Sequence, residues 1–124
     1  MAIFLGTSLD DTLKGGSGND SLFGADGNDS LTGSGSNNTL DGGAGNDTIN
    51  TQYGGGGNVL RGGAGNDLYL LSASQSSQIQ DTDGIDNVLI GFSTSTSIAL
   101  SLSPGILGLG RQGTSLVVDI NKDG

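Results

Sequence analysis

Apolar or aromatic residues recur at every ninth position along the first half of the chain. When units of nine residues are counted from Gly6, the eighth position is occupied by Leu13, Leu22, Leu31, Leu40, Ile49, Leu60 and Tyr69. Thr51 and Gln52 interrupt the count once. Positions seven to nine can form one short strand whose middle side chain faces inward, because successive side chains of a strand alternate between its faces. The period therefore predicts a stack of short strands joined by turns, whereas a flexible linker would not place apolar residues so regularly.

Glycine and aspartate occupy the remaining positions of each unit. Close copies of G-G-x-G-N-D begin at Gly15, Gly42 and Gly62, and the other units keep parts of this sequence in phase. Glycine at positions one, two and four permits positive φ and lets carbonyl oxygens approach a central ion. Position six supplies a carboxylate, and both kinds of oxygen suit the coordination of Ca2+. We therefore expect Ca2+ as the cofactor.

The composition supports a chain that binds cations in its turns. All 13 acidic residues are Asp, against four Lys and Arg, so the formal net charge is −9. Such a chain should not bind nucleic acid, because the phosphates would repel it. Asp tolerates turns and offers a short oxygen ligand, whereas Glu favours helices. With 25 Gly and 32% hydrophobic residues, a conventional apolar core is hard to assemble, so something else must contribute to folding.

Residues suited to catalysis are scarce. The chain has no Cys and no His, which removes thiol chemistry, disulfides, zinc sites of the usual kind and histidine acid-base catalysis. Its Asp residues repeat with the period of a scaffold, whereas a catalytic carboxylate pair needs two distinct environments. We therefore predict that this chain is not an enzyme.

The pattern G-G-x-G-x-D-x-U-x, where U is apolar, resembles the RTX (hemolysin-type) calcium-binding nonapeptide repeat over residues 6–70. The resemblance implies an all-β fold, a right-handed parallel β-roll or solenoid in which two nonapeptides complete each turn. It also implies that calcium lies between turns stacked on the same side. The metal-ligating residues that it suggests are Asp11, Asp20, Asp29, Asp47, Asp67, Asp86, Gly15, Gly16, Gly18, Gly24, Asp26, Gly27, Gly42, Gly43, Ala44, Gly45, Gly62, Gly63, Ala64, Gly65 and Asp83.

The repeat extends beyond the clear units if Leu71 is a single inserted residue. Residues 72–80 then place Ser77 at position six and Ile79 at position eight, and residues 81–89 place Asp86 and Val88 there. A plain acidic turn between two strands is the alternative for the last of these units. We therefore expect the β-roll to occupy residues 1–90, with clear repeats over 6–70 and an extension over 72–89.

The composition changes beyond Gly91 to Ser, Thr and Leu, and the regular Gly and Asp positions end there. Alternation at Ile98, Leu100 and Leu102 and the run Ser115–Ile120 predict strands. We expect residues 91–124 to form a strand-rich capping segment over the end of the roll. The final residues, Asp119 to Gly124, match the first half of an EF-hand loop but lack its closing acid, so a strand ending in a turn is favoured. This ending also suggests a truncated chain.

Successive nonapeptides alternate between two sides of such a roll, so the position-six residues form two rows. One row is wholly acidic and comprises Asp11, Asp29, Asp47, Asp67 and Asp86. The opposite row comprises Asp20, Asn38, Asn58 and Ser77. We expect calcium to line the acidic side more completely, and we expect an Asn38–Asn58 contact to use amide hydrogen bonding. This assignment assumes that Thr51-Gln52 and Leu71 bulge out of the coil without adding a half-turn.

These features favour a module that folds when extracellular calcium binds. The resemblance implies a secreted bacterial protein, exported by type I secretion machinery that reads a natural C-terminal extension. No segment is long and apolar enough for a membrane span, and the start MAIFLGTSLDD lacks the features of a cleavable signal peptide. A rigid adhesive or surface-layer spacer is the alternative, and a test of attachment to cells or matrix would separate the two. We expect a monomer.

Overall fold

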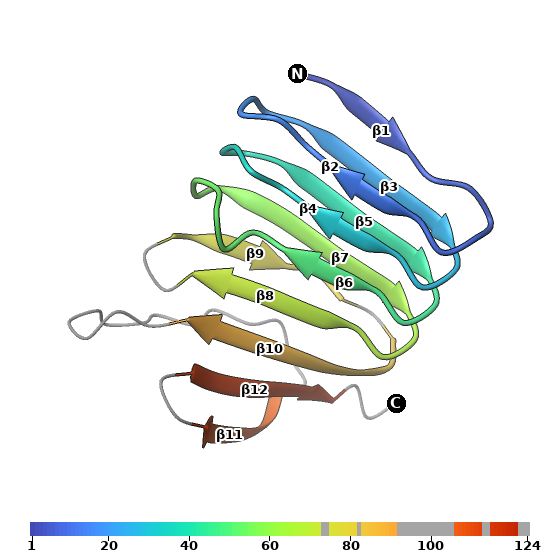
Figure 1. Cartoon of the computed structure of the whole chain (residues 1–124). Coiled ribbons are helices and arrows are strands. Elements are labelled where there is room, and N and C mark those ends of the chain that lie inside the picture. The colour runs from blue at the N-terminus through green and yellow to red at the C-terminus, as the bar shows by residue number, and fades with distance from the viewer. Residues whose placement is uncertain (73–74, 82, 92–105, 113–114, 122–124) are drawn as a thin grey trace.

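The computed structural model describes residues 1–72, 75–81, 83–91, 106–112 and 115–121, the last two ranges as backbone only. Every regular element in these ranges is a β-strand. The strands form a solenoid of about five turns, with two sheets that face each other (Figure 1). Within the same ranges no helix is long and apolar enough to span a membrane.

The first sheet contains five parallel strands. Its order is β1-β3-β5-β7-β9. The strands are β1 (Ile3–Leu5), β3 (Ser21–Asp26), β5 (Thr39–Ala44), β7 (Asn58–Ala64) and β9 (Ser77–Ile79). Strands that are neighbours in this sheet belong to successive turns of the solenoid, because each chain segment between them crosses to the second sheet and returns.

The second sheet contains seven strands in the order β11-β12-β10-β8-β6-β4-β2. The parallel part comprises β2 (Thr12–Lys14), β4 (Ser30–Thr32), β6 (Thr48–Asn50), β8 (Leu68–Ser72) and β10 (Ile85–Gly91). Strands β11 (Ile106–Gln112) and β12 (Ser115–Asn121) extend the sheet in antiparallel pairing.

Position eight of each unit supplies the core between the two sheets. Leu31 lies in β4 and Leu40 in β5, and both side chains are 0% exposed, whereas Thr39 is only half-buried. The predicted register is therefore confirmed, because a shift by one residue would bury Thr39 and expose Leu40. The fully buried members of this ladder are Leu22, Leu31, Leu40, Ile49, Leu60, Tyr69 and Val88.

The strands of the two later units continue the same ladder. Ser77 of β9 pairs with Asn58 of β7, so Ile79 lies beside Leu60 and is 8% exposed. Val88 of β10 pairs with Tyr69 of β8. The coils are 18, 18, 20 and 19 residues long between successive acidic position-six residues, and the stack absorbs these differences without losing register.

Thr51 and Leu71 do not bulge out of the coil, so the expectation was wrong for these two residues. Thr51 is 1% exposed and its N–H donates to the Leu70 carbonyl at 2.9 Å. Leu71 is 9% exposed and pairs with Ile90 inside the second sheet. Each follows an inward-facing residue by two positions, so its side chain also faces inward, where burial of the leucine is favourable. No half-turn is added, as the sequence predicted.

The described part of the C-terminal segment covers one edge of the second sheet. The predicted strand Ser115–Ile120 is found as β12, which pairs with β10 from Ser115 opposite Gly91 to Asn121 opposite Ile85. The alternation at residues 98–102 and the turn at residues 122–124 lie outside the described residues.

Candidate metal sites

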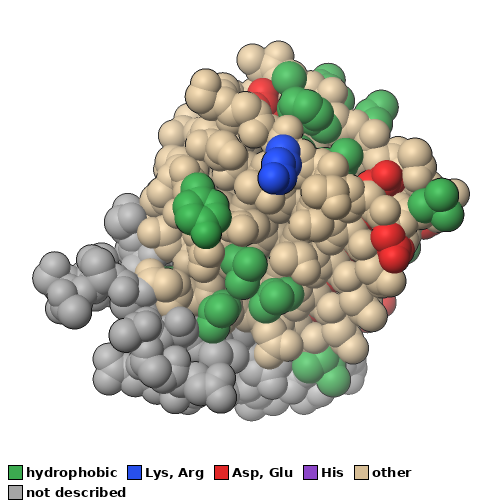
Figure 2. All heavy atoms as spheres, in the orientation of Figure 1, with side chains coloured by type: hydrophobic (Ala, Val, Ile, Leu, Met, Phe, Trp, Pro, Cys, Tyr) green, Lys and Arg blue, Asp and Glu red, His purple; other side chains and the backbone are tan. Residues whose placement is uncertain are grey.

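The turns of the solenoid gather along two edges, which we name by their position-six residues. The acidic edge carries Asp11, Asp29, Asp47, Asp67 and Asp86, and the neutral edge carries Asp20, Asn38, Asn58 and Ser77. The strands fix this division, since each crossing of a sheet moves the chain from one edge to the other (Figure 1). Few acidic side chains appear on the face seen in Figure 2, and most of the acidic row is buried.

Each carboxylate of the acidic edge from Asp29 onward caps a backbone group of the preceding coil. The N–H of Asp11 donates to Oδ1 of Asp29, and the N–H of Asp29 donates to Oδ1 of Asp47, both at 2.7 Å. The same bond joins Asp47 to Asp67 at 2.7 Å and Asp67 to Asp86 at 2.8 Å. One oxygen of each carboxylate from Asp29 onward therefore stabilises the stack directly.

The second oxygen of three of these carboxylates has no such partner. Oδ2 of Asp29, Asp47 and Asp67 is buried and accepts no hydrogen bond from the described residues. Their parent residues are only 2%, 1% and 1% exposed, respectively. A buried carboxylate oxygen without a partner is costly, because it has lost its water without replacement. A hard cation such as Ca2+ would supply the missing partner, so the residues present fit this ion.

Glycine at position one leaves the space into which these oxygens point. A Cβ added at Gly24 or Gly42 would lie 2.2 Å from Oδ2 of the aspartate five residues later, and one at Gly62 would lie 1.9 Å from Oδ2 of Asp67. The sequence had suggested positive φ at this position, but none of these three residues has it. Steric clearance is therefore the reason for glycine here.

In the turns that begin at Gly24, Gly42 and Gly62, positions two and four do have positive φ. The angle is +108° at Gly43 and +135° at Gly45, and +106° at Gly63 and +127° at Gly65. Ala25 adopts +87° at position two, which costs more for a residue with a Cβ. A Cβ added at any of these four glycines would lie within 2.1 Å of a carbonyl oxygen of the preceding coil, so glycine also allows the turns to stack closely.

A ladder of side chains at position five also joins the acidic turns. The N–H of Asn46 donates to Oδ1 of Asn28, and that of Asn66 donates to Oδ1 of Asn46, both at 2.8 Å. At one end of the ladder the N–H of Asn28 donates to Oδ1 of Asp10, and at the other end the N–H of Ile85 donates to Oδ1 of Asn66. The sequence analysis missed this role, although the recurring Asn-Asp pair in the close copies was the available signal.

Burial raises the pKa of several carboxyl groups on the acidic edge. The pKa of Asp67 rises to about 6, mainly because the group is desolvated, while the N–H of Asp47 opposes the rise and the charges of Asp81 and Asp47 add to it. The pKa of Asp86 rises to about 7, again mainly through burial. The pKa of Asp47 is raised for the same first reason. These groups resist ionisation without a cation beside them.

The position-six asparagines of the neutral edge satisfy their polar groups without a cation. Oδ1 of Asn38 accepts from the N–H of Asp20 at 2.7 Å, and Oδ1 of Asn58 accepts from the N–H of Asn38 at 2.9 Å. The predicted Asn38–Asn58 contact is thus present, but the amide nitrogens bond elsewhere. Nδ2 of Asn38 donates to the Gly35 carbonyl and Nδ2 of Asn58 to the Gly55 carbonyl, at 2.9 and 2.7 Å.

Asp20 belongs to a close copy of the repeat, yet its turn differs from those of the acidic edge. Oδ1 accepts from the N–H of Ala2 at 2.7 Å and Oδ2 from the N–H of Gly16 at 2.8 Å. Gly15, Gly16 and Gly18 lack the positive φ seen on the other edge. Both carboxylate oxygens of Asp20 are therefore occupied by backbone groups.

The remaining predicted ligands occupy less buried positions. Asp26 and Asp83 have exposed side chains, and Oδ1 of Asp83 accepts from the N–H of Gly84 at 3.0 Å. Oδ2 of Asp11 accepts from both the N–H and the hydroxyl of Thr7. Gly27 has φ of +108°, and the other position-four glycines of this edge also have positive φ. The carbonyl oxygens of Ala44 and Ala64 accept hydrogen bonds from N–H groups of the preceding coil.

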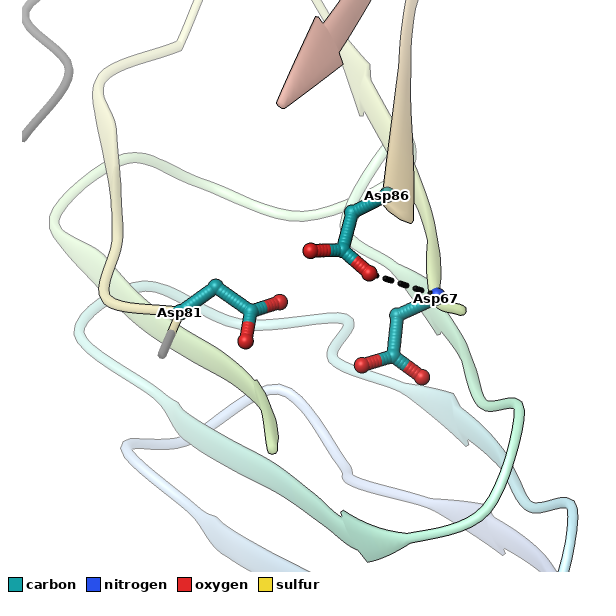
Figure 3. Close-up of side chains that lie close together, drawn as sticks. All are labelled: Asp67, Asp81 and Asp86. Atoms are coloured by element: carbon teal, nitrogen blue, oxygen red, sulfur yellow. Dashed lines mark hydrogen bonds between the residues drawn. The ribbon is translucent and has the colours of Figure 1, made fainter. Parts of the chain in front are cut away.

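Asp81 was absent from the predicted ligands, although the structure brings it to the acidic row. A carboxylate oxygen of Asp81 lies within 4.8 Å of carboxylate oxygens of Asp67 and Asp86 (Figure 3). The signal in the sequence was the replacement of glycine by an acid at position one of the last unit.

Comparison with known families finds a match to the RTX calcium-binding nonapeptide repeat, described as four copies, over residues 5–40, 23–52 and 53–69. Together these ranges cover more than half of the chain. No curated protein and no solved structure matches the chain. The matched ranges contain the turns of both edges as far as Tyr69.

Proposed function

Because the chain belongs to the family of RTX calcium-binding nonapeptide repeats, we propose that it is a calcium-binding module whose folding is triggered by extracellular calcium. The observation that carries this proposal is the row of buried oxygens at Oδ2 of Asp29, Asp47 and Asp67, which have no hydrogen-bond partners among the described residues. A β-roll completed only by a cation links its folding to the concentration of that cation.

Electrostatic repulsion along the acidic edge supplies the energy of the trigger. Adjacent coils of a parallel β-structure lie about 4.8 Å apart, and two unit charges at this distance repel by roughly 3 kcal/mol at an effective dielectric constant near 20. Several such contacts would exceed the stability of a small domain. Calcium, when bound, supplies the positive charge that offsets this repulsion, while Asp29, Asp47 and Asp67 hold it through their Oδ2 atoms.

The concentration of calcium outside cells suits such a trigger. Extracellular calcium sites typically bind with dissociation constants on the order of 10⁻⁴ to 10⁻³ M, so a chain in calcium-poor cytosol would remain unfolded. Export in an unfolded state, followed by folding outside, agrees with a secreted protein that uses type I machinery. The module itself contributes folding and stability, and we assign no catalysis to it.

Circular dichroism in the far ultraviolet tests this function. We expect a largely disordered spectrum in excess chelator and a cooperative gain of β-structure in millimolar Ca2+, with a much weaker response to Mg2+, which prefers a smaller octahedral site. Identical spectra in chelator and in calcium would overturn the proposal.

A matched pair of triple variants locates the trigger. Replacement of Asp29, Asp47 and Asp67 by Asn should abolish the response to calcium, because the carboxylate charges are lost. Replacement of Asp10, Asp26 and Asp83 by Asn changes the net charge equally. The sequence suggested Asp26 and Asp83 as ligands, but all three residues are exposed, unlike the buried row, so this control should keep the response. Equal behaviour of the two triple variants would show that only net charge matters.

A further inference from the structure

The last turn of the acidic edge differs from the others at its first position. Gly24, Gly42 and Gly62 occupy this position in the earlier turns, where a Cβ would come within 2.2 Å of the buried carboxylate oxygen. In the last turn the residue is Asp81. An acid therefore stands where the repeat otherwise requires the absence of a side chain.

The side chain of Asp81 points toward two carboxylates of the acidic row. Figure 3 shows Asp67, Asp81 and Asp86 facing a common space, and one carboxylate oxygen of each lies within 4.8 Å of the others. Asp67 and Asp86 are 1% and 2% exposed, and Asp81 is half-buried. Three carboxylates so close together repel strongly unless a cation lies between them.

Tyr69 holds the Asp81 carboxylate in this direction. The N–H of Gly62 donates to the Tyr69 hydroxyl at 2.6 Å, and that hydroxyl donates to Oδ2 of Asp81. The N–H of Gly63 lies 3.4 Å from Oδ1 of Asp81. Tyrosine replaces the aliphatic residue of the core ladder only at this place in the roll, so the aromatic hydroxyl and the extra acid occur together.

An unpartnered oxygen provides an independent indication of a ligand. Oδ2 of Asp67 is buried and accepts no hydrogen bond from the described residues. A Cβ built on Gly62 would lie 1.9 Å from this oxygen and 2.6 Å from the Tyr69 hydroxyl, so the oxygen faces the Asp81 side of the coil. The ion pair found in the described ranges joins Arg61 to Asp41 and does not reach the cluster.

We propose that Asp67, Asp81 and Asp86 form a three-carboxylate site that binds Ca2+ more tightly than the other sites of the acidic edge. The inference rests on the proposed calcium function, but it concerns one site whose extra ligand comes from outside the position-six row. Calcium affinity rises with the number of charged ligands, and the third carboxylate adds one. The tightest calcium site of the module therefore lies at the end of the roll beside β10.

Terbium luminescence tests this site, because Tb3+ replaces Ca2+ at oxygen sites and emits when a nearby tyrosine is excited. The chain has two tyrosines and no tryptophan, and Tyr53 is 78% exposed. In a Tyr53→Phe background, emission excited through tyrosine reports ions close to Tyr69. We expect the first phase of a Tb3+ titration to be sensitised and to be reversed by Ca2+.

Substitutions at Asp81 should weaken this first phase by about tenfold or more. Asp81→Gly restores the residue found in the other acidic turns, and Asp81→Asn keeps the shape of the side chain and an acceptor for Tyr69. Asp10→Asn is the matched control, because it removes one exposed charge in the first turn, keeps the Oδ1 that accepts from the N–H of Asn28, and should leave the first phase unchanged.

Two outcomes separate this inference from the proposed function. If Asp81→Gly and Asp10→Asn give the same terbium midpoint, or if the first phase is not sensitised through tyrosine, the three-carboxylate site is wrong, even where calcium still induces β-structure by circular dichroism. If calcium induces no β-structure in the unsubstituted chain while the first phase is weakened only at Asp81, the site stands and the folding trigger fails.

Discussion

The two edges of the roll share one core and one register, but the aspartates of the acidic edge and the two asparagines of the neutral edge differ in the second terminal atom of the position-six side chain. On the acidic edge this atom is a carboxylate oxygen, which in Asp29, Asp47 and Asp67 is buried without a hydrogen-bond partner in the described part of the chain. On the neutral edge it is the amide nitrogen of Asn38 or Asn58, which donates to a carbonyl of its own turn.

The comparison separates stacking from cation dependence. Oδ1 caps the N–H of the preceding coil on both edges, at 2.7 to 2.9 Å. Stacking is therefore independent of the charge of the side chain. The dependence on a cation arises from the remaining atom alone, since an amide nitrogen is a donor and a carboxylate oxygen is only an acceptor.

A carboxylate introduced on the neutral edge should have the largest effect. Asn38→Asp replaces the donor that faces the Gly35 carbonyl by an oxygen in a residue that is 1% exposed. We expect the free energy of unfolding in calcium to fall by about 3 kcal/mol, because the substitution removes the hydrogen bond to the Gly35 carbonyl and buries a carboxylate charge in its place. Denaturant unfolding measures this change.

Asn37→Asp is the control for that experiment, since it makes the same replacement at an exposed neighbouring position. It should change the stability much less. An unchanged stability of Asn38→Asp in calcium would mean that the neutral edge can also accept a cation, and the distinction between the edges would disappear.

A carboxylate removed from the acidic edge should have the next largest effect. Asp47 lies between Asp29 and Asp67 in the stack, so Asp47→Asn weakens two neighbouring sites. We expect the calcium concentration at the midpoint of folding to rise by about tenfold, equivalent to about 1.4 kcal/mol. Circular dichroism during a calcium titration provides the measurement.

The matched variant Asp20→Asn should shift the calcium midpoint less, because backbone N–H groups already occupy both oxygens of Asp20. A larger shift at Asp20 than at Asp47 would reverse the assignment of the edges.

A change of pH should have the smallest effect, and it should act through the acidic edge. The pKa of Asp67 is raised to about 6 and that of Asp86 to about 7, mainly by burial. Without calcium the folded chain therefore retains protons that the unfolded chain releases, so its stability falls as pH rises from about 4 to about 7. Protons compete with calcium, so the calcium midpoint should rise by a few-fold on acidification from about pH 7.5 to about pH 5.5.

Calcium titrations at the two pH values test this dependence. The combined variant Asp67→Asn and Asp86→Asn should flatten it, because the two titrating groups are removed. A midpoint that rises with pH would contradict the sign derived from the raised pKa values.

The sequence predicted the fold because its pattern is local and periodic. An apolar residue at every ninth position fixes which side chains face inward, as Leu40 and Thr39 show. The division of position-six residues into two rows follows from the same count. The count did not show that Thr51 and Leu71 face inward, because the place where a coil takes up extra residues depends on the neighbouring coils.

The role of the glycine at position one also became clear only from the tertiary structure. Sequence reasoning assigned it to backbone conformation, whereas the structure shows that Gly62 gives clearance for Oδ2 of Asp67. For the same reason Asp81 was not among the predicted ligands. Asp81 is close to Asp86 along the chain, but Asp67 belongs to the preceding coil, and only the stacking of the coils brings it near Asp81.

By itself, the sequence determined the repeat, the inward ladder from Leu22 to Val88 and the acidic character of one row, since these depend only on spacing along the chain. The tertiary structure decided which polar atoms are satisfied. Asp20 and Asp47 occupy the same position of nearly identical units, yet only the second has a buried oxygen without a partner among the described residues. The physical reason is that each hydrogen bond depends on the backbone of the turn and of the adjacent coil, which the period of the sequence does not specify.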